Sequence, residues 1–128
     1  TASVEELQED FAPFRALSHL PLAMTAHILF TAIDPELPAT LSPKVISVIR
    51  EKIGFTNLLM SDDLCMKALK GTQSELARQT LDAGCDLVLH CNGAYEEIAE
   101  IIHALTEYPA FPIACLPIIS PLALKQSA

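Results

Sequence analysis

Residues 54–64 read Gly-Phe-Thr-Asn-Leu-Leu-Met-Ser-Asp-Asp-Leu, an apolar, strand-like stretch that ends in two adjacent carboxylates. Carboxylates repel one another and are costly to bury, so such a pair at the end of a buried strand requires a physical explanation. One explanation is catalysis, because α/β proteins handle ligands at the tips of their strands. The other is local structure, in which Asp62 begins a loop and Asp63 caps a turn. The stretch by itself leaves both explanations open.

An apolar segment followed by a helix signal occurs three times in the chain. We predict strands near residues 22–27, 57–61 and 86–90, each followed by a helix, the last of which spans Tyr95 to Tyr108. Strands that alternate with helices in this way predict a parallel sheet covered by helices. The sequence therefore indicates the α/β fold class.

The helices have recognisable first residues. Capping boxes occur at residues 3–6 and 72–75, and Ser42 stands before a proline at the first helical position. Pro13 is expected to kink or split the first helix, because proline lacks the N–H that an interior helical position needs. Gly54 and Gly84 are natural stops for the helices that precede the second and third strands.

Composition limits the classes of function. The chain has 128 residues, is 51% hydrophobic, and carries a net charge of −8. Its Lys and Arg residues form no basic stripe, so we expect no nucleic-acid partner. No apolar run approaches the length of a membrane span, so we expect no membrane partner either.

Four cysteines, at positions 65, 85, 91 and 115, form no Cys-x-x-Cys motif. We expect them to be reduced, small apolar residues of a cytoplasmic protein, since the reducing cytosol disfavours disulfides. Their spacing fits no recognised zinc site, so no metal and no cofactor are expected.

Several blocks of sequence resemble glycoside hydrolase family 3, and within it the bacterial β-N-acetylglucosaminidases (β-hexosaminidases) of cell-wall recycling. The blocks are Leu-Ala-Met-Thr-Ala-His at 22–27, Pro-Ala-Thr-Leu-Ser-Pro-Lys-Val-Ile at 38–46, Gly-Phe at 54–55, Met-Ser-Asp-Asp-Leu-Cys-Met at 60–66, and Ala-Gly-Cys-Asp-Leu-Val-Leu-His-Cys-Asn at 83–92. They follow the family's order and spacing over about residues 10–105.

The resemblance implies a (β/α)₈ TIM barrel, which needs eight strands and about 250 residues. Three strands correspond to roughly the last three β/α units. We therefore interpret residues 1–108 as the C-terminal portion of such a barrel, and the Pro-rich apolar residues 109–128 as an unassigned tail. A three-stranded sheet has open edges, so self-association or pairing with the missing barrel half is expected. Whether the chain is a fragment, a truncated gene product or one subunit of an assembly stays open.

The resemblance also implies a retaining hydrolase of N-acetylglucosamine linkages in peptidoglycan fragments, with Asp62 as the nucleophile. His27 and Met60 are the expected substrate-binding residues. The family's general acid is a histidine in an Asp-x-His motif, and neither that motif nor the family's Lys-His pair that holds the sugar occurs in this chain. We therefore expect the isolated chain to be nearly inactive.

Two other functions remain open on the sequence. The first is a noncatalytic protein derived from the barrel, with the nucleophile retained. The second is a metal-dependent hydrolase that uses His27, Asp62 and His90 at neighbouring strand ends. Strand-end packing is the other interpretation of residues 90–92, and Asp86 is expected to hold the turn between helix and strand.

Overall fold

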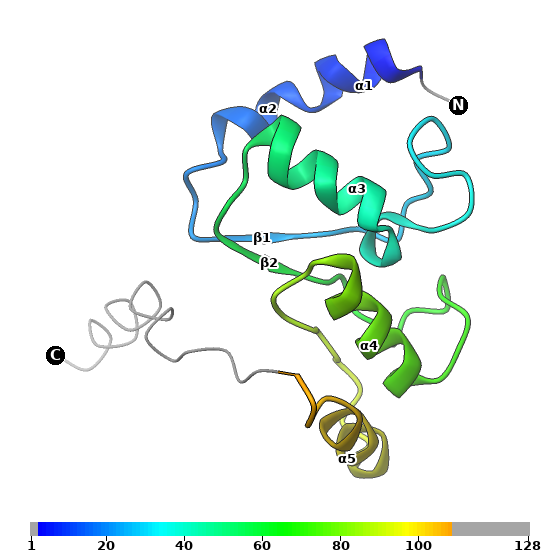
Figure 1. Cartoon of the computed structure of the whole chain (residues 1–128). Coiled ribbons are helices and arrows are strands. Elements are labelled where there is room, and N and C mark those ends of the chain that lie inside the picture. Colours follow the sequence, from blue (N-terminus) through cyan, green and yellow to red (C-terminus); the bar gives the residue numbers. More distant parts are fainter. Residues whose placement is uncertain (1–2, 109–128) are drawn as a thin grey trace, which may run out of the picture.

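The computed structural model describes residues 3–108, which form an α/β unit with a two-stranded parallel sheet and helices packed around it (Figure 1). The elements in chain order are α1 (Val4–Asp10), α2 (Ala12–Ala16), strand β1 (Leu22–Met24), the 3-10 turn η1 (Ala39–Leu41), α3 (Pro43–Ser47), the π-helical segment η2 (Val48–Ile53), strand β2 (Leu58–Met60), α4 (Gln73–Ala83) and α5 (Tyr95–Ala104). The alternation of strand and helix is as predicted. The expected tail, residues 109–128, lies outside the described residues.

The sheet is parallel, as predicted, but its strands are shorter than expected. Strands β1 and β2 pair with Leu22 opposite Leu58 and Met24 opposite Met60. The third predicted strand, residues 86–90, is wrong as a strand: it contributes a single parallel bridge between Leu87 and Met60.

Hydroxyl side chains explain why both ladders stop. The backbone N–H of Asp62 donates to Thr25 Oγ1 (3.2 Å), and that of Leu89 donates to Ser61 Oγ (2.8 Å). A backbone N–H that bonds to a side chain no longer bonds to the facing carbonyl, so regular pairing ends at these points. Because Thr25 and Ser61 both lie at strand ends, the chain leaves the sheet where the polar residues begin.

The predicted helix starts are confirmed. Ser3 with Glu6, and Thr72 with Glu75, form reciprocal capping boxes, and the Ser42 side chain accepts a hydrogen bond from the Val45 N–H. These bonds satisfy N–H groups that have no partner within their own helix.

The predicted break in the first helix and the predicted end of α4 are confirmed, whereas the predicted end of α5 is wrong. The first helix is split at Phe11, two residues before Pro13, as the missing proline N–H requires. Gly84 ends α4 with φ 108°, and a Cβ added there would lie 3.0 Å from Ile46 Cγ2. Helix α5 ends at Ala104 rather than Tyr108, and its apolar residues are only partly buried, since Ile102 is 63% exposed.

Two buried clusters flank the loop that follows β2. One contains Leu59 with residues of α3 and the 83–85 turn, and the other contains Leu64 with residues of α4 and α5. Leu59 and Leu64 are each only 1% exposed. The residues between them, including both aspartates, are therefore anchored on either side by the core.

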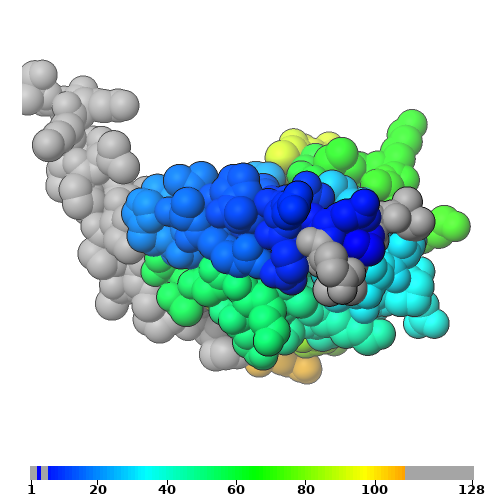
Figure 2. Space-filling view, turned by 90° about the horizontal axis from the view of Figure 1, so that it is seen from above, coloured from blue at the N-terminus to red at the C-terminus, as the bar shows by residue number. Residues whose placement is uncertain are grey.

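The outer side of β1 is apolar and open. Leu22 and Met24 are 38% and 51% exposed, and a groove of about 410 Å³ runs between β1 and the helices α2 and η2. Figure 2 shows from above how α1 and α2 (blue) lie across the molecule beside the green α3–η2 segment. Within residues 3–108, no helix is long and apolar enough to cross a membrane.

Candidate functional site

Asp62 and Asp63 lie where the sequence predicted, just beyond the carboxyl end of β2 (Leu58–Met60). Both side chains are half-buried. Asp62 Oδ1 accepts the backbone N–H of Asp63 at 2.8 Å, whereas its Oδ2 receives no hydrogen bond from the described part of the chain. One oxygen of Asp62 is thus held by its own loop, while the other has no hydrogen-bond partner in residues 3–108.

His27 approaches this loop from the chain that follows β1. Its Nε2 lies 2.9 Å from the Asp63 carbonyl oxygen, and its Nδ1 lies 2.9 Å from Thr40 Oγ1. Thr40 Oγ1 is in turn 2.9 Å from Thr25 Oγ1, which accepts the Asp62 N–H. These three side chains form a relay, a continuous chain of hydrogen bonds from the Asp62 backbone N–H to the Asp63 backbone carbonyl.

The direction of this relay follows from the chemistry of its ends. A carbonyl oxygen only accepts, so His27 Nε2 must donate to Asp63, and in the neutral ring Nδ1 then accepts from the Thr40 hydroxyl. Thr40 Oγ1 accepts from the Thr25 hydroxyl, and Thr25 Oγ1 accepts from the Asp62 backbone. Each acceptor in the relay thus receives one hydrogen bond, an arrangement that a neutral imidazole allows. Because both ends of the relay are backbone groups of Asp62 and Asp63, it holds the loop that carries the aspartate pair.

Asp63 fastens two loops together. Its Oδ1 accepts the backbone N–H groups of Cys65 and Cys91, each at 3.0 Å. The bond from Cys65 is the main cause that lowers the pKa of the Asp63 carboxyl below its usual 3.8. Asp63 therefore fastens the loop that carries Asp62 to the segment after His90, whereas the Asp62 carboxylate, among the described residues, accepts only the N–H of its own neighbour.

Met60 and His27, the two expected substrate-binding residues, are both engaged in hydrogen bonds within the chain. Met60 is half-buried on β2, and its carbonyl accepts the Thr25 N–H at 2.9 Å. His27 is also half-buried, and both of its ring nitrogens already have protein partners. A hydrogen bond from His27 to a sugar hydroxyl would have to replace one of these contacts.

Asp86 holds the turn between α4 and the 86–90 segment, as expected. Its Oδ2 lies 2.7 Å from Arg50 Nη2 and accepts the Leu59 N–H at 2.8 Å. The same arginine donates to the carbonyls of Phe55, Asn57 and Gly84. This cluster joins the start of β2 to the start of the 86–90 segment, so it sets the position from which the aspartate loop emerges.

The structure does not assemble a metal centre from the residues it describes. In residues 3–108 there is no group of three or more His, Cys, Asp and Glu side chains arranged to hold an ion. The three residues of the metal-dependent interpretation, His27, Asp62 and His90, belong to separate contacts, because His90 bonds to Cys65. Cys65, Cys85 and Cys91 are free thiols, and Cys115 lies outside the described residues.

The sequence analysis did not assign a role to Thr25 or Thr40, although both belong to the relay. The two threonines are 7% and 0% exposed. The available signal was a polar residue inside an apolar stretch, Leu-Ala-Met-Thr-Ala-His, since a buried hydroxyl requires a hydrogen-bond partner. The partner itself was not evident, because Thr40 lies fifteen positions away.

A carboxylate at the carboxyl end of a parallel strand, with helices packed around the sheet, is the arrangement of an α/β enzyme site. Residues 2–110 match the glycosyl hydrolase family 3 N-terminal domain. The chain therefore belongs to glycoside hydrolase family 3.

Curated relatives and solved structures agree with this membership. The β-hexosaminidase of Alkalilimnicola ehrlichii is 47% identical over 88 residues, which are 65% of this chain and 25% of that protein. The β-N-acetylglucosaminidase from Thermotoga maritima superposes with a TM-score of 0.72 at 38% identity, covering 81% of this chain and 24% of that one. NagZ from Neisseria gonorrhoeae in complex with zinc ion superposes with a TM-score of 0.73 at 33% identity, covering 89% and 33%. The chain thus spans about a quarter to a third of these relatives.

Proposed function

We propose that this chain supplies the nucleophile of a retaining β-N-acetylhexosaminidase, with Asp62 as that nucleophile. The observation that carries the proposal is the free Oδ2 of Asp62 on a loop held by Asp63, His27 and the core. A nucleophile must be held in one orientation while its attacking atom stays accessible. Membership of glycoside hydrolase family 3 supports the reaction class.

The chemistry assigns Asp62 two steps. Its free oxygen attacks the anomeric carbon while the glycosidic C–O bond breaks, which forms a covalent glycosyl-enzyme. Water then hydrolyses this ester with net retention of configuration. The leaving oxygen needs a proton from a general acid that this sequence does not contain as an Asp-x-His motif. Met60 borders the sugar, and His27 contacts it by exchanging one of its two protein hydrogen bonds.

The proposed substrates are terminal β-linked N-acetylglucosamine residues in peptidoglycan fragments, and the proposed location is the cytoplasm. Two matched structures are of a β-N-acetylglucosaminidase and of NagZ, and several curated relatives are called β-hexosaminidase. Cys65, Cys85 and Cys91 form no disulfide within residues 3–108, which fits the proposed reducing compartment.

We further propose that the unit is part of a (β/α)₈ barrel, completed by pairing of the outer side of β1 with preceding strands. Leu22, Met24 and Ile28 are 38–53% exposed beside the apolar groove. An exposed apolar strand at a sheet edge is favourable only when another element covers it.

A chimera tests the assignment of Asp62. The stretch of this chain that aligns over 88 residues with the Alkalilimnicola ehrlichii β-hexosaminidase would replace the matching segment of that enzyme. The chimera should hydrolyse p-nitrophenyl N-acetylglucosaminide, and a fluorinated N-acetylglucosaminide should label Asp62. The Asp62→Asn variant should lose about 10³-fold or more of the rate, with the Asp63→Asn variant as the matched control. Labelling of Asp63, or near-normal turnover by Asp62→Asn, would show that the wrong carboxylate was assigned.

The second candidate function is a noncatalytic protein derived from this barrel. It is favoured by one observation, that the chain keeps the aspartate loop and lacks both the Asp-x-His and the Lys-His motifs. Under this hypothesis the chimera would fold, with a cooperative thermal transition near that of the parent enzyme, but would neither turn over substrate nor accept the label. Turnover together with labelling of Asp62 would exclude it.

A further inference from the structure

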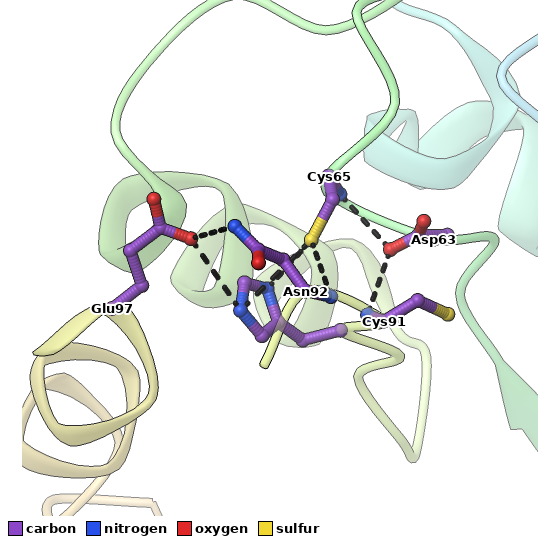
Figure 3. Close-up of polar contacts among 6 residues, drawn as sticks. Asp63, Cys65, Cys91, Asn92 and Glu97 are labelled. Atoms are coloured by element: carbon purple, nitrogen blue, oxygen red, sulfur yellow. Dashed lines mark hydrogen bonds and ion pairs between the residues drawn. The ribbon is translucent and has the colours of Figure 1, made fainter. Parts of the chain in front are cut away.

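Behind the aspartate loop lies a cluster of a thiol, an imidazole and a carboxylate (Figure 3). Cys65 Sγ is 3.0 Å from His90 Nδ1, and His90 Nε2 is 3.6 Å from Glu97 Oε2. The Asn92 side chain donates to the same Glu97 oxygen at 3.0 Å, and its backbone N–H donates to Cys65 Sγ at 3.3 Å. The proposed glycosidase reaction uses none of these four side chains.

The geometry matches the general requirements of an activated nucleophile. Such a group lies within hydrogen-bond reach of a base, and a third group orients that base. The His90 side chain is only 8% exposed, so its ring is held by packing as well as by Glu97. The Asn92 N–H points at the sulfur, where it stabilises negative charge that develops as the proton leaves.

Cys85 and Cys91, the other two described thiols, have no imidazole within hydrogen-bond reach in residues 3–108. Burial raises the pKa of Cys85 to about 11, and that residue is 5% exposed. Desolvation, followed by the nearby Asp63 carboxylate, raises the pKa of Cys91, although Cys91 is exposed. Because the thiolate is the reactive form, both environments suppress reactivity. Accessibility alone would make Cys91 the faster of the two loop thiols, since Cys65 is half-buried.

We propose that Cys65 is a nucleophilic thiol activated by His90, and that it is a modification site for small, soft carbon electrophiles. In the reaction with an alkyl iodide, the sulfur forms a bond to the carbon and the carbon–iodine bond breaks. Iodide leaves with the bonding electrons, and His90 Nδ1 takes the thiol proton. The proposal does not depend on the glycosidase reaction, so it stands or fails separately.

The test is the relative alkylation rate of the thiols in the full 128-residue chain carrying Cys115→Ser. Limiting iodoacetamide and peptide mass spectrometry would give the rate at each cysteine in the same molecules. Cys65 should react at least about tenfold faster than Cys91 in the folded chain, and the two rates should converge in concentrated urea. A folded chain in which Cys91 reacts as fast as Cys65, or faster, would overturn the proposal.

The role of His90 has its own variants. His90→Phe keeps a ring of similar shape and removes the base, and should slow Cys65 at least about tenfold. The exposed His103 on α5 provides the matched control, because His103→Phe should leave the rate unchanged. Buried Cys85 reports folding in the same spectra, since it should stay unlabelled in a folded chain.

A second variant is needed if Cys85 becomes alkylated in His90→Phe, because that labelling would show that the variant does not fold. Glu97→Gln keeps an acceptor for Asn92 and removes the charge that orients His90, and it should slow Cys65 by a few fold, with Glu100→Gln as its control. Equal Cys65 rates in Glu97→Gln and Glu100→Gln would then overturn the role of the cluster.

Discussion

Two regions of the molecule differ in how far the chain itself supplies their partners. These are the carboxyl end of the small sheet and the outer side of β1. At the carboxyl end, Thr25, Thr40, His27 and Asp63 each have hydrogen-bond partners within the chain. Along the outer side of β1, Leu22 and Met24 remain exposed beside an apolar groove. The polar framework of the candidate site is therefore complete in this segment, whereas the apolar core is not.

The contrast reflects two kinds of interaction. Hydrogen bonds are short and directional, so a few residues at neighbouring strand ends satisfy one another locally. The stabilisation gained by burying apolar surface grows with the area buried. A two-stranded sheet that is covered mainly on one side therefore leaves the apolar residues of its other side exposed to solvent. Four predictions separate the two regions, and they are given from the largest expected effect to the smallest.

The largest effect concerns catalysis. The 128-residue chain alone should turn over p-nitrophenyl N-acetylglucosaminide at least about 10²-fold more slowly than the chimera, because a missing general acid typically costs about 10²–10⁴-fold. Steady-state rates of both proteins, with Asp62→Asn versions as blanks, measure the difference. Robust turnover by the chain alone would show that the proposed acid is not needed or is present in an unrecognised form.

The second prediction compares two large apolar residues, the buried Leu64 of the core and the exposed Met24 of β1. Leu64→Ala should lower the free energy of unfolding by about 2–5 kcal/mol, because Leu64 is 1% exposed in the core. Met24→Ala should change it by about 0.5 kcal/mol or less, because Met24 is 51% exposed. Urea unfolding monitored by circular dichroism would measure both. Equal losses would show that the outer side of β1 is already covered, for instance by a second copy.

The third prediction tests the hydroxyl relay. Thr40→Val keeps the shape of the side chain but leaves His27 Nδ1 and the Thr25 hydroxyl without their partner, and should cost about 1–3 kcal/mol of unfolding free energy. Thr80 is the matched control, since it is equally buried and its Oγ1 has no hydrogen-bond partner in the described chain. Thr80→Val should therefore be neutral or slightly stabilising. Equal effects in the two variants would contradict the relay.

The smallest effect concerns acid stability. The pKa of Asp63 is lower in the folded chain than its usual 3.8, so its ionisation stabilises the fold above that value. This contribution is lost as the pH falls from about 3.8 through the lowered folded value. Asp63→Asn keeps the acceptor oxygen without the charge, so the stability difference between wild type and variant should shrink on acidification. Urea titrations at several pH values would measure it, and a constant difference across this range would contradict the assignment.

Local signals predicted most of the helices because caps act within one turn. The capping boxes at Ser3 and Thr72, the break near Pro13 and the glycine stop at Gly84 all occur where the sequence indicates. Helix α5 ended early, and the 86–90 strand shrank to a bridge. The strand was shortened because a serine hydroxyl took the ladder N–H of Leu89, a competition that apolar patterning does not reveal.

The position of the candidate site was predictable from the sequence, but the hydrogen-bond partners of its residues were not. An apolar run that ends in Asp62 and Asp63 places both at the end of a strand, and the structure agrees. The sequence left open whether the pair is catalytic or local in role, and in the structure Oδ1 of Asp63 accepts backbone N–H groups from the loop after β2 and from the segment after His90. The thiol cluster was missed, because residues 90–92 were interpreted as strand-end packing, Cys65 as a small apolar residue, and Glu97 was given no role.

The sequence by itself determined the helix caps and the position of the aspartate pair, because these depend on neighbours within a few residues, and it indicated the α/β class and the parallel sheet through the alternation of strands and helices. Only the tertiary structure decided which distant groups meet. Thr40 reaches His27 across thirteen positions and Cys65 reaches His90 across twenty-five. The first contact depends on how η1 packs beside the end of β1, and the second on how the 86–90 segment packs against β2. No local pattern of residue types specifies the distance between two side chains brought together by a folded core.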